Sequence, residues 1–382
     1  MDFIYRNTTQ IYYTKSLGED LNDFIKNAGF QRLLIVTGGN STKAIAETIQ
    51  KELSIDSRLF DGIQTNPLSE KVEEIVKQAK DFTPDAIITV GGGSVHDTGK
   101  AIAIMLNDCD GNITEDYTVN GKLSVPGIKK VLPVITIPTI FGSGAEVSPA
   151  ALIRIGQEKR VIFSPLLHPL ACFINIEYAK GLSKDVIARS AFDSLIQALE
   201  GFVSLAANNI SNAFARITID NFNTCLPYLI EGKYTNDVLE KISIASIFSS
   251  YVCSTASVGA IHAISDPISG RFNVHHGTAL AMVAKEVLQK NIRETNESVV
   301  KELDALLSNM SSNKHDLRDK VVDKIGKIVN DLCLLSNVKK RHVDKDVISR
   351  MVKESHNGDM IGNPYSFSDE EIECILRNWY ED

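Results

Sequence analysis

Two stretches in the second half of the chain place carboxylate, amide and imidazole side chains at helical spacing. Asp193 and Gln197 are four residues apart in AFDSLIQALE, and His262 and Asp266 have the same spacing in IHAISDPISG. Residues four apart lie on one face of a helix, and His276 opens a further helical pattern. One carboxylate and two imidazoles suit zinc or iron. Buried polar pairs that satisfy one another would produce the same spacing, so both readings stay open.

A second chemistry-bearing stretch, TVGGGSVHDTGK, lies in the first half of the chain. The apolar, β-rich segment 86–90 leads directly into Gly91, Gly92 and Gly93, and a helical pattern follows from Ser94. Glycines let backbone N–H groups approach a phosphate, and the dipole of the following helix favours negative charge there. The spacing differs from the G-x-G-x-x-G fingerprint. The run therefore predicts an anion site, with a plain tight turn as the alternative.

Strand and helix patterns alternate through the first 180 residues. Strands are expected within 1–15 and at 32–37, 57–60, 86–90 and 131–138. Helices are expected at 21–28, 42–53, 67–79 and from 94 onward. Such alternation predicts a parallel sheet with helices on both faces. Ligands of such sheets bind at the carboxyl ends of the strands, where glycine-rich turns at 38–39, 91–93 and 142–144 all fall.

Strand patterns nearly vanish after residue 180. Long amphipathic segments predict helices at 184–205, 209–230, 236–258, 277–290, 296–308, 315–335, 345–355 and 368–380. We therefore expect two domains packed around a cleft. Residues 1–180 would form a nicotinamide dinucleotide-binding α/β domain, and residues 181–382 an all-helical metal and substrate domain.

The composition is that of an ordinary globular protein, with 382 residues, 43% hydrophobic residues and a formal charge of −8. The acidic balance argues against nucleic-acid binding. No stretch approaches the roughly 18 apolar residues of a membrane span, and the N-terminus does not read as a signal peptide. The absence of a C-x-x-C pair indicates reduced thiols, and we expect a cytoplasmic protein. The cysteines are at positions 109, 172, 225, 253, 333 and 374.

Together these stretches resemble the iron-containing (group III) alcohol dehydrogenases across essentially the whole chain. The matching pieces are NP at 66–67, GGGSVHDTGK at 91–100, IPTIFGSGAEV at 137–147, the Asp193 helix, the block 259–277 and GNP at 362–364. The resemblance implies a dehydroquinate synthase-like fold, with an N-terminal dinucleotide domain and an all-helical C-terminal domain. It also implies a nicotinamide cofactor, a divalent metal (iron or zinc) and reduction of aldehydes or ketones. We further expect a homodimer.

The resemblance assigns the cofactor residues. Gly92, Gly93 and Ser94 would hold the pyrophosphate, and Asp97 and Lys100 would support that turn. The other expected cofactor contacts are Gly38, Gly39, Asn40, Ser41, Asn66, Thr136, Thr139, Ser143 and Lys159.

The resemblance also assigns the metal ligands as Asp193, His262 and His276, with Gln197 as a weak amide donor. Gln197 stands where the family has a histidine. Three ligands suffice in relatives such as glycerol dehydrogenase and dehydroquinate synthase, and an open fourth position suits catalysis. Loss of an imidazole should still weaken the affinity for the metal.

His262 and Asp266 are the expected catalytic residues. Asp266 replaces a second histidine of the family, which is thought to pass protons near the nicotinamide. A carboxylate can relay a proton, but its usual pKa of about 4 matches neutral pH poorly unless burial raises it. Binding of a cationic or hydroxylated substrate, or a structural role, are the alternatives.

The favoured activity is metal-dependent hydride transfer between NAD(P)(H) and a carbonyl compound. A specialised carbonyl substrate is compatible with the sequence, including an anionic, phosphonate or sugar-derived one. Four cations are candidates for an anion clamp, with surface solvation as the alternative role: Arg154, Lys159, Arg160 and Arg271.

Two other functions are considered. A dehydroquinate synthase-like cyclase would share the scaffold, but its phosphate-binding lysines and arginines are not recognisable here. A catalytically degenerate paralogue could bind a nucleotide as a partner. The two missing histidines favour that alternative, and the intact glycine turns argue against it.

The turn TGGNSTK at 37–43 bears on the choice of cofactor. NAD enzymes commonly carry an acidic residue there that binds the ribose hydroxyls and repels a 2′-phosphate. This turn has no carboxylate; Asn40 and Ser41 can donate hydrogen bonds and Lys43 adds positive charge. The turn therefore predicts a preference for NADP(H) over NAD(H), with a simple lack of discrimination as the alternative.

Overall fold

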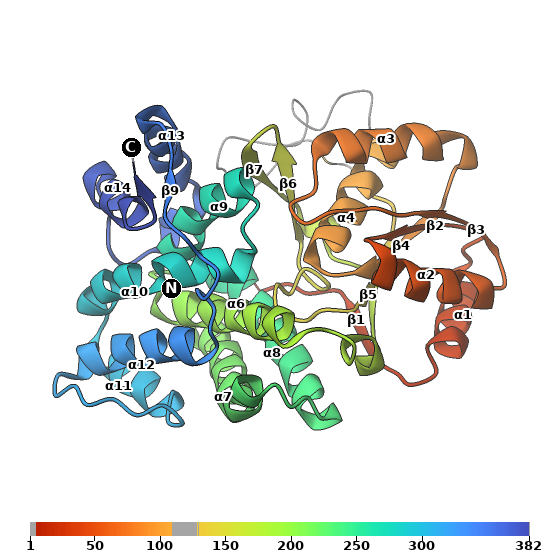
Figure 1. Cartoon of the computed structure of the whole chain (residues 1–382). Coiled ribbons are helices and arrows are strands. Elements are labelled where there is room, and N and C mark those ends of the chain that lie inside the picture. The colour runs from red at the N-terminus through yellow and green to blue at the C-terminus, as the bar shows by residue number, and fades with distance from the viewer. Residues whose placement is uncertain (1–4, 109–127, 129, 382) are drawn as a thin grey trace. The chain divides into compact units, whose positions relative to one another are not determined.

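The structure is a computed structural model that describes residues 5–108, 128 and 130–381. The chain forms two compact units (Figure 1). One unit is Arg6–Gly181, and the other is Leu182–Asp382 together with Tyr5.

The N-terminal unit contains a six-stranded sheet in the order β1-β8-β5-β4-β2-β3. Every pair in it is parallel. The strands are β1 (Gln10–Tyr13), β2 (Arg32–Thr37), β3 (Asp56–Phe60), β4 (Ala86–Gly91), β5 (Val134–Pro138) and β8 (Ala171–Ile174). The central strands β2, β4 and β5 are almost entirely buried and apolar, as expected for a parallel sheet with both faces covered.

Helices cover both faces of this sheet (Figure 1). On one face, α1 (Leu17–Ala28) and α2 (Asn40–Glu52) bury Leu21 and Ile49 in a core with Ile35. On the other, α3 (Ser69–Ala79) and α4 (Gly93–Asp108) form a core with Leu34. Leu34 and Ile35 serve opposite faces because successive side chains of a strand alternate. The predicted α/β fold with a parallel sheet is confirmed.

Several elements of this unit were not predicted. An antiparallel hairpin joins β6 (Ala150–Ile155) and β7 (Glu158–Phe163). The sequence of β7, EKRVIF, has no clear alternation, and β8 is only four residues long, so neither produces a strong local pattern. Helix α3 begins at Ser69 rather than residue 67, because the backbone of Leu68 is extended (φ −85°, ψ 142°). Short 3-10 helices are η1 (Lys80–Phe82), η2 (Pro165–Leu167) and η3 (Ile176–Ala179).

The C-terminal unit is helical and is organised around α6 (Lys184–Val203). This helix is buried along most of its length and contacts α7, α8 and α10. The other helices are α7 (Asn209–Glu231), α8 (Asn236–Ala256), α9 (Ala260–Phe272), α10 (His276–Glu294), α11 (Glu297–Leu306), α12 (Leu317–Asp331), α13 (Lys345–Ser355) and α14 (Asp369–Arg377). A 3-10 turn, η4 (Gly358–Gly362), and a two-residue strand pair, β9 (Arg341–His342) with β10 (Tyr380–Glu381), complete the unit.

Two sequence-based expectations concern the whole chain. Among the described helices, none alone has the length and apolar character of a membrane span; α8 and α9 meet that criterion only as a pair, bent by 111° at their junction. The described cysteines are all free thiols: Cys172, Cys225, Cys253, Cys333 and Cys374. Cys109 lies outside the described residues.

Candidate functional site

Three glycine-containing turns of the N-terminal unit follow adjacent strands. Strand β4 lies between β2 and β5, so the turns after all three meet at one edge of the sheet. The Thr139 amide donates to the Gly91 carbonyl at 2.9 Å, and the Gly62 amide donates to the Gly38 carbonyl at 3.0 Å. The chain moves outward from β2 to β3 and then returns to the other side of β2. Ligands of doubly wound sheets bind at such a reversal.

The start of α4 packs closely against the turn after β5. A Cβ added at Gly93 would lie 2.7 Å from the Ser143 hydroxyl oxygen, so a larger residue at position 93 would require Ser143 or the start of α4 to move. Gly92, Gly93 and Ser94 are partly exposed, and Ser143 is exposed. This helix N-terminus is therefore partly exposed, as an anion-binding site requires.

Three predicted cofactor residues are instead buried behind this edge. Lys100 is fully buried, and its ammonium donates to the carbonyls of Ala145 (2.6 Å) and Ala150 (2.8 Å). The Thr136 hydroxyl donates to the Glu146 carbonyl at 2.8 Å. Burial lowers the pKa of Lys100 to about 8 and raises the pKa of Asp97 to about 6, and each partly offsets the shift of the other. Lys100 and Thr136 thus hold the loop after β5.

The remaining predicted cofactor residues of this unit differ in exposure. Gly39, Asn40 and Ser41 are exposed at the start of α2, while Gly38 is buried. Asn66 and Thr139 are also buried. Lys159 is partly buried and lies on β7 opposite Arg154.

A carboxylate that the sequence pattern missed lies beside the turn after β2. Asp61 follows β3, and its Oδ2 atom is 2.6 Å from the Lys43 ammonium. The hydrogen bond and charge of Lys43 lower the pKa of Asp61. Residues 37–43 contain no acidic residue, but the tertiary structure supplies one. No local signal could have identified it, since β2 and β3 are separated by α2.

In the C-terminal unit, three helices bring the predicted metal ligands together. Asp193 lies on α6, His262 on α9 and His276 at the first position of α10. Their ligand atoms all lie within 4.8 Å of one another. The Asp193 Oδ1 atom is 3.4 Å from His262 Nε2 and 3.9 Å from His276 Nε2. One carboxylate oxygen and two imidazole nitrogens therefore converge on one point.

The predicted accessory residues lie at the same point. Gln197 is one turn after Asp193 on α6, and its amide nitrogen donates to Asp193 Oδ1 at 3.1 Å. Asp266 is one turn after His262 on α9, and its Oδ1 atom is 4.0 Å from His276 Nδ1. Both side chains are buried.

Close helix packing positions His276. A Cβ added at Gly277 would lie 2.1 Å from the Arg189 carbonyl oxygen, so only glycine lets the first turn of α10 approach the backbone of α6 this closely. Because Asp193 is one turn further along α6, the same contact brings His276 to Asp193.

Glu200, which the sequence analysis did not single out, contacts the cluster from behind. Its Oε2 atom accepts a hydrogen bond from His262 Nδ1 at 2.5 Å, and it is only 2% exposed. Burial lowers the pKa of His262, but Glu200 and Asp193 outweigh this and raise it to about 10. The spacing of seven residues from Asp193 on one helix face was the available signal.

The donors fit a divalent first-row metal. His262 Nε2 is buried and accepts or donates no hydrogen bond among the described residues. A nitrogen in that position beside a carboxylate would be satisfied by a bound cation. The mixed oxygen and nitrogen set suits zinc or iron.

Arg271 and Arg160, both candidates for binding an anion, have carboxylate partners. The Arg271 guanidinium is almost fully buried and is paired with Glu354. Arg160 is 2.8 Å from Glu158 on the same hairpin strand.

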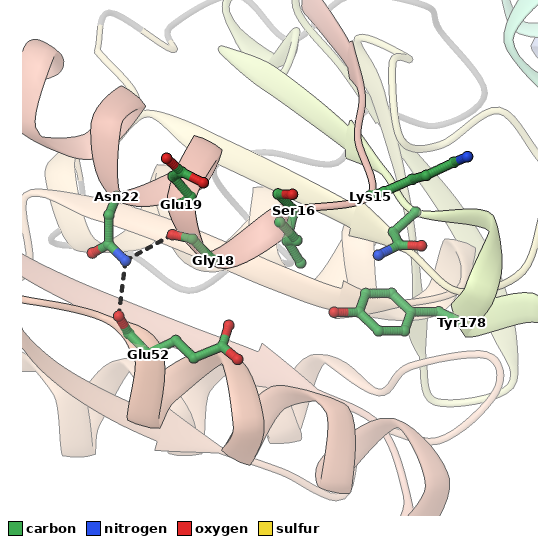
Figure 2. Close-up of a pocket in the computed structure, with 9 residues that line it drawn as sticks. Lys15, Ser16, Gly18, Glu19, Asn22, Glu52 and Tyr178 are labelled. Carbon is green, nitrogen blue, oxygen red and sulfur yellow. Dashed lines mark hydrogen bonds between the residues drawn. The ribbon is translucent and has the colours of Figure 1, made fainter.

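An open hollow of about 490 Å³ lies elsewhere on the N-terminal unit (Figure 2). Asn22 crosses part of it, and its amide donates to the carbonyls of Gly18 (2.7 Å) and Glu52 (2.8 Å). The bond to Glu52 joins α1 to the end of α2. None of the predicted site residues lines this hollow: its lining is Lys15, Ser16, Leu17, Gly18, Glu19, Asn22, Glu52, Asn175 and Tyr178.

Known proteins are similar to this chain in sequence and in fold. Alcohol dehydrogenase 4 of Schizosaccharomyces pombe is 29% identical over 71% of this chain and 64% of its own length. A 4-hydroxybutyrate dehydrogenase of Clostridium kluyveri is 28% identical over 68% of this chain and 70% of its own. The crystal structure of an iron-containing alcohol dehydrogenase from Thermotoga maritima, 23% identical, superposes with a TM-score of 0.84 over 99% of both chains.

Family models cover most of the sequence. The model of iron-containing alcohol dehydrogenase matches residues 8–176, and that of the C-terminal part of the Fe-containing alcohol dehydrogenase family matches residues 187–380. The expected resemblance is thus confirmed. Members of this family are oxidoreductases that use a nicotinamide cofactor and a divalent metal. This chain belongs to the iron-containing alcohol dehydrogenase family.

Proposed function

We propose that the chain is a metal-dependent, NAD(P)H-linked alcohol dehydrogenase that reduces a small aldehyde or ketone and oxidises the corresponding alcohol. The observation that carries the proposal is the convergence of Asp193, His262 and His276, whose ligand atoms lie within 4.8 Å of one another. In this proposal residues 1–180 bind the nucleotide, and residues 181–382 bind the metal and substrate.

The cluster residues have distinct roles in the proposal. Asp193, His262 and His276 would hold a divalent metal and leave a coordination position for the substrate oxygen, with Gln197 as a weak fourth donor. The metal, when bound, supplies Lewis-acid polarisation of the carbonyl. Asp266, buried on the same helix as His262, would exchange the proton with the alcohol oxygen.

In the N-terminal unit the backbone would bind the cofactor. Amides of Gly92, Gly93 and Ser94 at the start of α4 would hold the pyrophosphate. Thr139 and Ser143 follow β5 at the same edge, where they would line the cofactor. The cofactor would exchange a hydride with the carbonyl carbon.

We propose a preference for NADP(H). Asn40 and Ser41 are exposed beside Lys43, and together they can bind a 2′-phosphate. Lys43 is paired with Asp61, so the phosphate would have to compete with that carboxylate for the ammonium group. Comparing kcat/KM for NADPH and NADH tests this directly. A higher value for NADH would refute it.

The proposed substrate class is a small functionalised carbonyl compound. The C. kluyveri relative is named for a hydroxy acid, which supports including anionic aldehydes; phosphonates and sugar-derived carbonyls stay in the proposed class on the sequence alone. Arg160 and Arg271 pair with Glu158 and Glu354, so an anionic substrate group would have to compete with these carboxylates for either guanidinium group. Comparing the reduction rates of matched neutral and anionic aldehydes tests whether cationic side chains bind an anionic substrate group. Equal rates would exclude such an anion clamp.

The principal experiment combines anaerobic metal analysis with a fluorescence titration of the reduced nicotinamide. We expect about one zinc or iron per chain, binding of NADPH, and aldehyde reduction that chelation removes and added metal restores. Nucleotide binding without metal or turnover would support the degenerate paralogue instead. Full activity after chelation would remove the metal from the mechanism.

We also propose that the enzyme is a cytoplasmic homodimer; the scattered cysteines without a C-x-x-C pair support the location. Light scattering after size exclusion would test the dimer, and fractionation of the source cells would test the location.

A further inference from the structure

Glu200 makes two short hydrogen bonds to α9 from the face of α6 that carries Asp193. Its Oε2 atom accepts from His262 Nδ1 at 2.5 Å, and its Oε1 atom accepts from the Ile261 backbone amide at 2.6 Å. The side chain is 2% exposed. Both oxygens of one buried carboxylate are therefore used on two consecutive residues of a single helix.

The start of α9 requires such partners from outside the helix. Its N-cap residue is Gly259, which has no side chain to accept from the first free amides. The Asn363 Oδ1 atom accepts from the Ala260 amide at 3.0 Å, and Glu200 accepts from the next amide. A carboxylate at a helix N-terminus is also favoured by the helix dipole.

Gly259 is part of this arrangement. A Cβ at residue 259 would lie 2.9 Å from Glu200 Oε1 and 2.7 Å from Asn363 Oδ1. Any larger residue would displace at least one of the two oxygens from the start of α9. The approach of Glu200 to the start of α9 thus depends on glycine at residue 259.

The contact to His262 determines which imidazole nitrogen is available. When Nδ1 carries the proton that it donates to Glu200, the lone pair of a neutral ring is on Nε2. Nε2 is the nitrogen that lies 3.4 Å from Asp193 Oδ1 and within the ligand cluster. A carboxylate behind a metal-binding histidine in this way fixes both tautomer and ring orientation.

Building on the metal site proposed above, we propose that Glu200 is a positioning residue that presents Nε2 of His262 to the metal. It does so by accepting the Nδ1 proton while its other oxygen anchors the first turn of α9. The helix start and the ligand orientation are thus set by one side chain.

Glu200→Gln is the sharpest test because it preserves size while replacing one oxygen with an NH2 group. If the amide oxygen accepts from Ile261, the NH2 group faces His262 Nδ1 and places the ring proton on Nε2. In the reverse orientation, the NH2 group opposes the Ile261 amide. We expect Zn²⁺ affinity, measured by chelator competition on the full chain, to fall about 10- to 100-fold.

Asn363→Ala is the matched control. It removes the other side chain that accepts at the start of α9 and leaves the imidazole contact in place. Both variants should unfold at a lower temperature in the absence of metal. Only Glu200→Gln should lose Zn²⁺ affinity by tenfold or more. Equal losses of Zn²⁺ affinity in the two variants would mean that Glu200 only stabilises the start of α9, and would overturn the proposal.

A measurement on the wild-type protein covers the case in which Glu200→Gln does not fold. In Zn²⁺-loaded protein labelled with ¹⁵N-histidine, the His262 ring should show a protonated Nδ1 and a metal-bound Nε2, assigned by comparison with His262→Ala. Metal bound through Nδ1 would refute the proposal. Wild type that fails to bind Zn²⁺ or iron would refute the proposed metal site itself, whereas equal Zn²⁺ affinity in wild type and Glu200→Gln would refute only the role of Glu200.

Discussion

The glycine turns of the N-terminal unit and the carboxylate–histidine cluster of the C-terminal unit are built from different parts of the chain. The turn at 91–94 is continuous in sequence and offers backbone amides, with glycine at residue 93 where a Cβ would crowd Ser143. The cluster is assembled from single side chains on α6, α9 and α10. One site depends on the absence of side chains, and the other depends on their identity.

This difference has a consequence for mutation. Each backbone amide in a turn contributes a modest part of the affinity for an anion, because several adjacent amides bind it together. A metal site of three ligands loses a third of its donors with one substitution. Single changes in the cluster should therefore have larger effects than single changes in the turns, and effects on metal and nucleotide affinity should be separable.

The largest expected effect is that of His276→Ala. Removal of one of two imidazoles should abolish retention of zinc or iron and lower kcat/KM for aldehyde reduction at least about a thousandfold. Metal content by mass spectrometry and NADPH binding by fluorescence should be measured together. Nucleotide affinity should stay within about twofold of the wild-type value.

His315→Ala is the control for that variant, since His315 is exposed and outside the cluster. It should behave as wild type. If His276→Ala retains its metal and full activity, the prediction that single changes in the cluster have larger effects than single changes in the turns is wrong.

A smaller effect is expected from Gly93→Ala in the proposed nucleotide-binding turn. The added Cβ would lie 2.7 Å from the Ser143 hydroxyl, and the start of α4 must shift or Ser143 must rotate. We expect the dissociation constant for the cofactor to rise about tenfold, with the affinity for Zn²⁺ unchanged. Calorimetric titration of each ligand measures both quantities.

Gly326→Ala provides the matched substitution. Residue 326 is within α12, and nothing lies within 4 Å of an added Cβ there. This variant should bind both ligands normally, and its free energy of unfolding should rise by about 0.5–1 kcal/mol. A loss of Zn²⁺ affinity in Gly93→Ala would show that the two regions are coupled.

Gln197→His should strengthen the cluster. An imidazole one turn after Asp193 would add a better donor than the amide, and we expect Zn²⁺ to bind about tenfold more tightly. Activity need not rise, because the pocket is adapted to the weaker amide donor at residue 197. Unchanged affinity, with Gln197→Ala also unchanged, would place residue 197 outside the coordination sphere.

The smallest expected effect is on the choice of cofactor. Asp61→Asn removes the carboxylate paired with Lys43, so a 2′-phosphate would no longer compete with it. Because both partners are about 40% exposed, we expect the ratio of kcat/KM for NADPH over NADH to rise only about two- to fivefold. Gly38→Asp should shift the same ratio in the opposite direction by like-charge repulsion. A fall in the ratio for Asp61→Asn would mean that the carboxylate does not face the phosphate.

Much of the fold was predictable because its signals are local. Continuous apolar runs predicted β2, β4 and β5, and long amphipathic patterns predicted most helices of the C-terminal unit within a few residues. Helix α9 was absent from the predicted segments because its buried residues surround it on all sides and it contains Pro267. A helix without a polar face has no amphipathic period to detect.

Some features of the candidate site were likewise predictable from the sequence, and others were not. By itself, the sequence determined the glycine turn after β4 and the donor types at residues 193, 262 and 276, since these depend on residue identity and short spacing. Only the tertiary structure decided that Glu200 contacts His262, that Asp61 contacts Lys43 and that Lys100 binds the loop after β5. Each of those contacts joins residues 18 to 62 positions apart. Local backbone preferences do not specify such pairs; they form only when whole helices and strands pack to exclude water and bring their buried polar groups together.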